Sequence, residues 1–163
     1  MTITETHLDA HLRGFIAESN AIEGIERDPS GEELRATRAF LLLPKLTIDD
    51  LKTLVEVYEP GARLRDQSTM NVRVGNYIAP GGGMSLVGRL GNLLSVCNHL
   101  RGNRDAITPW HAHVQYEVLH PFEDGNGRSG RALWAWCMLM RNEDPFRLCF
   151  LHAWYYQSLE RHR

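Results

Sequence analysis

A short stretch of the chain gathers residues that could carry out chemistry on a phosphate group. His120, Asp124, Arg128 and Arg131 lie close together around the Gly-Asn-Gly sequence at 125–127. Glycines there would let backbone N–H groups turn toward an anion, and the start of a helix would add its positive dipole end. The two arginines are three positions apart, so both could reach a polyphosphate from one helical face. The stretch therefore predicts a phosphate-binding loop that leads into a buried helix.

The residue types in this loop suit the separate steps of phosphoryl or nucleotidyl transfer. Histidine ordinarily titrates near neutral pH, so His120 is the candidate general base. Asp124 offers a hard oxygen ligand at the place where Mg²⁺ would bridge phosphates. We expect Phe122 to anchor the loop in the core and Glu123 to be a solvated side chain.

The remaining sequence predicts helices that would position this loop. Apolar residues recur at helical spacing, with Ser30 and Thr47 as helix caps and Pro44 as a break between segments. The run from Ala132 to Met140 is apolar on all sides, which predicts a helix at the centre of a bundle. The expected helices span about residues 4–20, 30–43, 47–58, 86–100, 108–119, 132–140 and 144–154.

The segment 71–80 has a different pattern. Val72 and Val74 alternate with polar residues before Gly75-Asn76, which supplies turn chemistry, and Tyr77-Ile78 follow, so a short β-hairpin is expected there. Its apolar residues are Val72, Val74, Tyr77 and Ile78. The predicted fold class is all-α with one β-hairpin.

Composition sets further bounds on the chain. Its 163 residues predict one domain, with 43% hydrophobic and 23% charged residues as in ordinary globular proteins. A net charge of −2 gives no indication of a nucleic-acid partner or a membrane surface. The polar N-terminus lacks a signal-peptide pattern, so we expect a cytoplasmic location. The cysteines at 97, 137 and 149 are expected to be buried, reduced thiols.

The sequence HPFEDGNGRSGR at 120–131 resembles the Fic motif, His-Pro-Phe-x-(Asp/Glu)-Gly-Asn-Gly-Arg-x-x-Arg, and fills every defining position. The order of helices, hairpin and loop from about Ser19 to Tyr156 is similar to the Fic core as well. The resemblance implies a Fic-type helical bundle in which the hairpin is a flap. It also implies transfer of AMP from ATP, with Mg²⁺, to a Ser, Thr or Tyr hydroxyl of a target protein.

The resemblance assigns a role to each loop residue. His120 would take the proton of the attacking hydroxyl, and Asp124 would hold Mg²⁺ against the phosphates. The remaining residues would bind the triphosphate: Gly125, Asn126 and Gly127 at the α-phosphate, Arg128 at the β-phosphate and Arg131 at the γ-phosphate.

In the Fic family, which this chain resembles, a flap in this position aligns a segment of the target by strand addition. The residues that would take this docking role are Val72, Val74, Tyr77 and Ile78. Tyr77 could also be a site of self-modification, although nothing in the sequence favours it over other hydroxyls.

The sequence SNAIEG at 19–24 matches the inhibitory pattern of the family, (Ser/Thr)-x-x-x-Glu-(Gly/Asn). Ser19 and Glu23 would share one face of an N-terminal helix over about 7–24. Glu23 could then pair with Arg131 and remove the arginine that would otherwise hold the γ-phosphate. The resemblance therefore implies an enzyme that is inhibited by its own N-terminal helix.

Several alternatives stay open at this stage. The chain could transfer UMP, GMP or phosphocholine, or it could remove AMP from a modified protein with the same residues. Phosphorylation with ATP bound in reverse is disfavoured by the intact Gly-Asn-Gly sequence. The chain could also be a non-catalytic nucleotide-binding regulator or one half of a complex, and a homo-oligomer is compatible with the family. The intact His120 argues against a pure binder, which has no need of a base.

Overall fold

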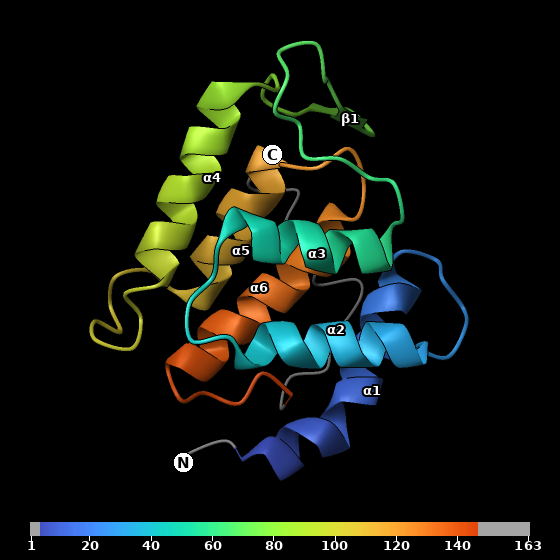
Figure 1. Ribbon diagram of the computed structural model, residues 1–163, viewed down its shortest axis with the longest axis vertical. Helices are drawn as coiled ribbons and strands as arrows, with labels where there is room; N and C mark the ends of the chain where they lie inside the picture. Colours follow the sequence, from blue (N-terminus) through green and yellow to red (C-terminus); the bar gives the residue numbers. More distant parts are fainter. Residues whose placement is uncertain (1–3, 147–163) are drawn as a thin grey trace.

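A computed structural model describes residues 4–146 of the chain. Within this range the fold is all-α with one two-stranded antiparallel hairpin, as predicted (Figure 1). The predicted helix from Asp144 onward falls mostly on residues 147–163, outside the described part. The elements are α1 Glu5–Ile22, α2 Gly31–Leu42, α3 Ile48–Tyr58, β1 Arg73–Val74, β2 Tyr77–Ile78, α4 Met84–Cys97, α5 Pro109–Leu119 and α6 Asn126–Met140.

Helix α6 is the centre of the fold. Twelve of its residues are buried, because both its polar first turn and its apolar second half are covered by other elements. It packs against α5, α2, α3 and α1, and Figure 1 shows α2 and α3 lying across it. Trp136 is fully buried and its indole N–H donates to the carbonyl of Leu43 at 2.9 Å. The predicted central helix is thus confirmed, and it begins at Asn126, inside the motif.

The helix boundaries follow the local signals in the sequence. Ser30 and Glu33 form a capping box at the start of α2, and Thr47 forms one with Asp50 at the start of α3. Thr108 caps α5, whose first residue is Pro109. These caps satisfy backbone N–H groups that have no partner within the helix.

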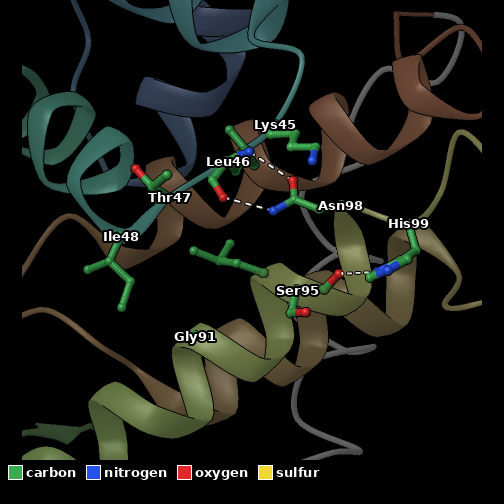
Figure 2. A pocket seen from close by; sticks show the side chains of 9 residues that line it. Lys45, Leu46, Thr47, Ile48, Gly91, Ser95, Asn98 and His99 are labelled. Carbon is green, nitrogen blue, oxygen red and sulfur yellow. Dashed lines mark hydrogen bonds between the residues drawn. The ribbon is translucent and has the colours of Figure 1, made fainter.

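The connection between α2 and α3 is fixed to the end of α4. Figure 2 shows the side-chain amide of Asn98 paired with the backbone of Leu46. Asn98 accepts a hydrogen bond from the Leu46 N–H at 2.8 Å and donates to the Leu46 carbonyl at 2.9 Å. The pocket beside this contact is a product of helix packing, and none of the predicted site residues lines it.

The hairpin is shorter than expected. Arg73 pairs with Ile78 and Val74 with Tyr77, around a turn in which Gly75 has φ +57°. Val72 lies just before β1, although its carbonyl accepts a hydrogen bond from the Ala79 N–H at 3.1 Å. In Figure 1 the hairpin lies at the end of the molecule near the start of α4, far from the N-terminus.

Two further expectations concern the whole chain. Among residues 4–146, no helix has the length and apolar character needed to cross a bilayer. Cys97 and Cys137 are buried and form no disulfide, as expected, whereas Cys149 lies outside the described residues.

Candidate active site

His120 stands at the junction of α5 and the motif loop. It caps the C-terminus of α5 with φ 49° and ψ 63°, a left-handed conformation that is uncommon for residues other than glycine. Its N–H donates to the Tyr116 carbonyl at 2.8 Å, which closes the last turn of the helix. The residue is 8% exposed. This turn ends the helix and directs the chain into the loop that the imidazole would serve.

Asn126 closes the loop on itself. Its side-chain oxygen accepts from the Phe122 N–H and its amide donates to the Phe122 carbonyl, both at 2.9 Å. Phe122 is 1% exposed and packs in the main core, so the predicted anchoring role is confirmed. Asn126 therefore shapes the loop, and its predicted contact with an α-phosphate stays a prediction.

The N-terminus of α6 offers an anion site made of backbone. Gly125 is its N-cap residue, with φ 74°, and no side chain of the described residues caps this end. The first-turn N–H groups have no intrahelical acceptors and carry the positive end of the helix dipole. The positive φ expected of a loop glycine is found at Gly125.

Gly127 differs from Gly125 in its backbone conformation. It lies within α6 and has no positive φ, so conformational freedom is not what it supplies. A Cβ atom at this position would collide with the Glu23 carboxylate and lie 3.2 Å from the Arg131 guanidinium. The missing side chain leaves space at the helix end, which a carboxylate occupies here and a phosphate could occupy instead.

Arg128 is paired with a carboxylate that the sequence reasoning missed. Its Nη2 donates to Glu59 Oε2 at 2.6 Å, and its guanidinium carbon lies 5.6 Å from the centre of the Tyr58 ring. Arg128 is 4% exposed, whereas the Glu59 side chain is 40% exposed. Burial raises the pKa of Tyr58 to about 12, so the ring beneath the cation stays neutral.

Arg131 is held by the end of α1. Its Nε donates to Ser19 Oγ at 2.8 Å, and its Nη2 donates to the Ser19 carbonyl at 2.9 Å and to Glu23 Oε1 at 2.7 Å. The arginine is 1% exposed and the Glu23 side chain 37% exposed. The ion pair expected between Glu23 and Arg131 is thus present, and Ser19 takes part as the matched pattern requires.

A buried polar network fixes this end of α1. The Glu33 carboxylate accepts from Asn20 at 3.1 Å and from Arg27 at 2.7 Å. Burial by itself would raise the pKa of Glu33, but hydrogen bonds from Arg27 and its neighbours outweigh burial and lower it to about 2. Glu33 completes the capping box of α2 with Ser30. The structure shows that it also secures the turn that carries Glu23.

Asp124 lies at the edge of the loop and is exposed. Its Oδ1 accepts from the Gly125 N–H at 2.6 Å, which turns the carboxylate toward the loop. Among residues 4–146, no three His, Cys, Asp or Glu side chains gather as a metal site. A single accessible carboxylate beside a phosphate-binding loop still fits Mg²⁺, which takes much of its coordination from phosphates and water.

Glu123 is more than the solvated side chain that was expected. Its carboxylate accepts two hydrogen bonds of 3.0 Å from Arg63, and these hydrogen bonds lower its pKa. The backbones of the two residues also pair, with the Glu123 N–H donating to the Arg63 carbonyl at 3.0 Å. Glu123 stays at the surface, as expected, and its contact with Arg63 shows that the segment before the flap runs beside the motif loop.

The four predicted docking residues do not share one environment. Ile78 is 66% exposed, while Val72, Val74 and Tyr77 are half-buried. The Tyr77 hydroxyl donates to the Val118 carbonyl at 2.7 Å, which ties the hairpin to the end of α5. Of the four side chains, Ile78 is therefore the most accessible to a target, and Tyr77 has an anchoring contact that was not expected.

Sequence reasoning also missed Arg65, which is fully buried. Burial lowers the pKa of its guanidinium, and backbone carbonyls surround it. An isolated arginine outside any motif gives no signal of such a role. Glu59, the C-cap residue of α3, gave no such signal either. Of the two histidines on α5, His113 is buried and His111 is exposed.

A comparison with known families agrees with this geometry. The model of the Fic/DOC family matches residues 45–138, which is more than half of the chain. The match includes the whole hairpin and the whole 120–131 loop but begins after Ser19 and Glu23. Membership in this family indicates a transferase of nucleotide-related groups that acts with nucleotide and protein substrates. The chain belongs to the Fic/DOC family.

Proposed function

We propose that the chain is a protein adenylyltransferase that transfers AMP from ATP to a Ser, Thr or Tyr hydroxyl of a target protein. One observation supports this proposal beyond what membership in the family indicates. One continuous loop–helix unit contains His120, the two buried arginines and the N-terminus of α6, which no side chain of the described residues caps. This arrangement supports in-line attack on a phosphorus atom held at the end of α6.

In the proposed reaction, His120 accepts the proton of the target hydroxyl as its oxygen forms a bond to the α-phosphorus. The bond from the α-phosphorus to the bridging oxygen of the β-phosphate breaks, and pyrophosphate leaves. The amides near Gly125 and Gly127 stabilise the charge on the α-phosphate, and Arg128 and Arg131 hold the departing phosphates. Mg²⁺ beside Asp124 would supply charge neutralisation on the triphosphate.

We further propose that Glu23 inhibits this reaction. A γ-phosphate that binds Arg131 has to displace the Glu23 carboxylate, and it also enters the space that Gly127 leaves open. With Glu23 in place, ATP would bind with its α-phosphate out of line for attack. Hydrogen bonds between charged groups contribute about 1.5–3 kcal/mol, which is enough to regulate binding but not to block it permanently.

The proposal extends to the layout of the domain, its location and its assembly. We propose that residues 1–163 act as one Fic domain, with an inhibitory helix at about 7–24, a flap at about 71–80 and a catalytic loop at 120–131. The flap backbone would receive the target segment, with Ile78 as the most exposed of the candidate contacts. A cytoplasmic location and a possible homo-oligomer remain part of this proposal.

The test is the intact mass of the purified chain after incubation with ATP and Mg²⁺. We expect Glu23→Gly to accumulate AMP adducts at least about tenfold faster than the native chain, because a charged hydrogen bond no longer competes with the γ-phosphate. His120→Ala in the Glu23→Gly background should remove the adduct. Glu26→Gly, which deletes a nearby exposed carboxylate, is the matched control and should resemble the native chain.

The same measurement separates the alternatives. An adduct with UTP or GTP but none with ATP would replace adenylyl transfer by another donor. ATP binding without any adduct in the Glu23→Gly chain would favour the non-catalytic regulator. Equal rates for the native chain and Glu23→Gly would remove the inhibitory role of Glu23.

A further inference from the structure

Arg65 joins three separate stretches of backbone through one side chain. Its Nη1 donates to the His120 carbonyl at 2.9 Å, its Nε donates to the Met70 carbonyl at 3.3 Å, and its Nη2 donates to the Pro80 carbonyl. Arg65 has no exposed surface. A buried guanidinium is costly unless its donors are satisfied, and here backbone carbonyls satisfy them. Met70 lies just before β1, Pro80 lies just after β2, and His120 is the proposed base.

The backbone of Arg65 makes the same connection. Its N–H donates to the Pro121 carbonyl at 2.9 Å, and its carbonyl accepts from the Gly83 N–H at 2.8 Å. Leu64 and Phe122 form an antiparallel bridge next to it. Gly82 sits so close that an added Cβ would lie 3.0 Å from the Arg65 carbonyl. The motif loop and the chain after the flap are therefore both hydrogen-bonded to the backbone of one residue.

A second contact fixes the flap to the same place. The Tyr77 hydroxyl donates to the Val118 carbonyl at 2.7 Å, two residues before His120. Tyr77 lies in β2, and Pro80 follows this strand. The flap is thus tied to residues 118–120 both by its own tyrosine and by Arg65.

We propose that Arg65, assisted by Tyr77, is a positioning residue that sets the distance between the flap and the His120 imidazole. The proposal rests on the proposed function, in which the target lies on the flap and gives its proton to His120. A misplacement of about 1 Å can cost about a hundredfold in rate, so a fixed flap-to-base distance has direct value for catalysis. Arginine suits this position because its planar fork carries five donors, whereas lysine offers three donors from a single nitrogen.

The experiment compares three substitutions in the Glu23→Gly background: Arg65→Lys, Tyr77→Phe, and Arg89→Lys as an exposed control on α4. The rate of AMP adduct formation is measured against ATP concentration, and ATP affinity is measured separately by calorimetry. We expect Arg65→Lys to lower kcat at least about tenfold because the base is no longer held in register. Tyr77→Phe should lower kcat about threefold through loss of one hydrogen bond. The KM for ATP and the ATP affinity should change less than about twofold, since the Arg65 side chain meets the loop at the His120 carbonyl and the Tyr77 hydroxyl meets the chain before the loop, at Val118.

The outcomes are distinguishable from a failure of the proposed function. If the Glu23→Gly parent forms no adduct, the proposed function fails before Arg65 is tested. If the parent is active and Arg65→Lys keeps its kcat, the positioning role is overturned. A parallel loss of ATP affinity and kcat also overturns it, because Arg65 would then maintain the fold as a whole. If Arg65→Lys does not fold, Tyr77→Phe decides: a lower kcat at unchanged ATP affinity supports the proposal, and an unchanged kcat overturns it.

Discussion

Arg128 and Arg131 lie one turn apart on α6, and both are buried against a carboxylate, yet their surroundings differ. Arg131 makes three hydrogen bonds to Ser19 and Glu23, at the end of α1. Arg128 makes one to Glu59, at the end of α3, and stacks near the Tyr58 ring. Glu59 lies inside the span that matches the Fic/DOC family, and Glu23 lies outside it.

This difference indicates separate roles for the two ion pairs. Glu59 lies inside the matched span, and we infer that its contact supports Arg128. Glu23 lies outside that span and its side chain is 37% exposed, so we propose that it can leave Arg131 while the rest of the fold stays in place. One carboxylate would then be a support and the other a competitor of a bound phosphate.

The contrast between the two ion pairs depends on the proposal that Arg128 and Arg131 both bind the nucleotide. We expect Arg128→Ala and Arg131→Ala, each in the Glu23→Gly background, to lower kcat/KM for adduct formation by about a hundredfold, the usual cost of removing one donor from a transition-state site. Circular dichroism would confirm that each variant retains its helices. Full activity without either arginine would leave that side chain as a core residue only.

The Glu33 network that fixes the end of α1 can be disrupted without changing Arg128 or Arg131. We expect Glu33→Gln to lower the free energy of unfolding by about 1.5–3 kcal/mol at neutral pH, because a buried carboxylate loses its charged hydrogen bonds to Asn20 and to the half-exposed Arg27. The native pKa of about 2 lies below the ordinary value of 4.5, so the stabilisation is present above pH 4.5 and is lost as the pH falls toward 2.

Urea unfolding of the native chain at several pH values would measure this loss. The Glu33→Gln chain should show a flatter dependence on pH over the same interval. Because a neutral amide oxygen accepts more weakly from Asn20 and Arg27 than the carboxylate does, adduct formation should also rise in this variant. A variant with native stability would show that the network does not secure the end of α1.

A substitution at Ser19 tests how far the binding of Arg131 to the end of α1 depends on Glu23 alone. We expect Ser19→Ala to raise adduct formation about threefold to fivefold, less than Glu23→Gly, since it removes one hydrogen bond to an uncharged hydroxyl and leaves the Ser19 carbonyl in place. Steady-state rates with ATP and Mg²⁺ would measure the effect. An increase equal to that of Glu23→Gly would shift the inhibitory role from the carboxylate to the serine.

The smallest effect is expected at Glu59. Its side chain is 40% exposed, so water screens the pair with Arg128, and the interaction is worth about 1 kcal/mol or less. We expect Glu59→Gln to change the KM for ATP by no more than about threefold in either direction. A tenfold or larger activation would make Glu59 a second inhibitory carboxylate and remove the contrast between the two pairs.

The local features of this protein could be predicted from the sequence. Helix periodicity, the caps at Ser30 and Thr47 and the glycine turn of the hairpin depend on neighbouring residues, and the structure confirms all of them. The dense pattern at 120–131 indicated the family for the same reason, since its residues act together over a few turns of chain. Glu23 was the one distant partner of the loop that a sequence pattern indicated.

The tertiary structure alone decided what surrounds that loop. The partners of Arg128, the network around Glu33 and the position of Arg65 between flap and base all join residues far apart in the sequence. No periodicity or cap records such contacts, because they arise from the free energy of packing whole helices and loops together. Local sequence determined which residues could do the chemistry, and the packing of distant segments determined which of them are held, buried or left open to a ligand.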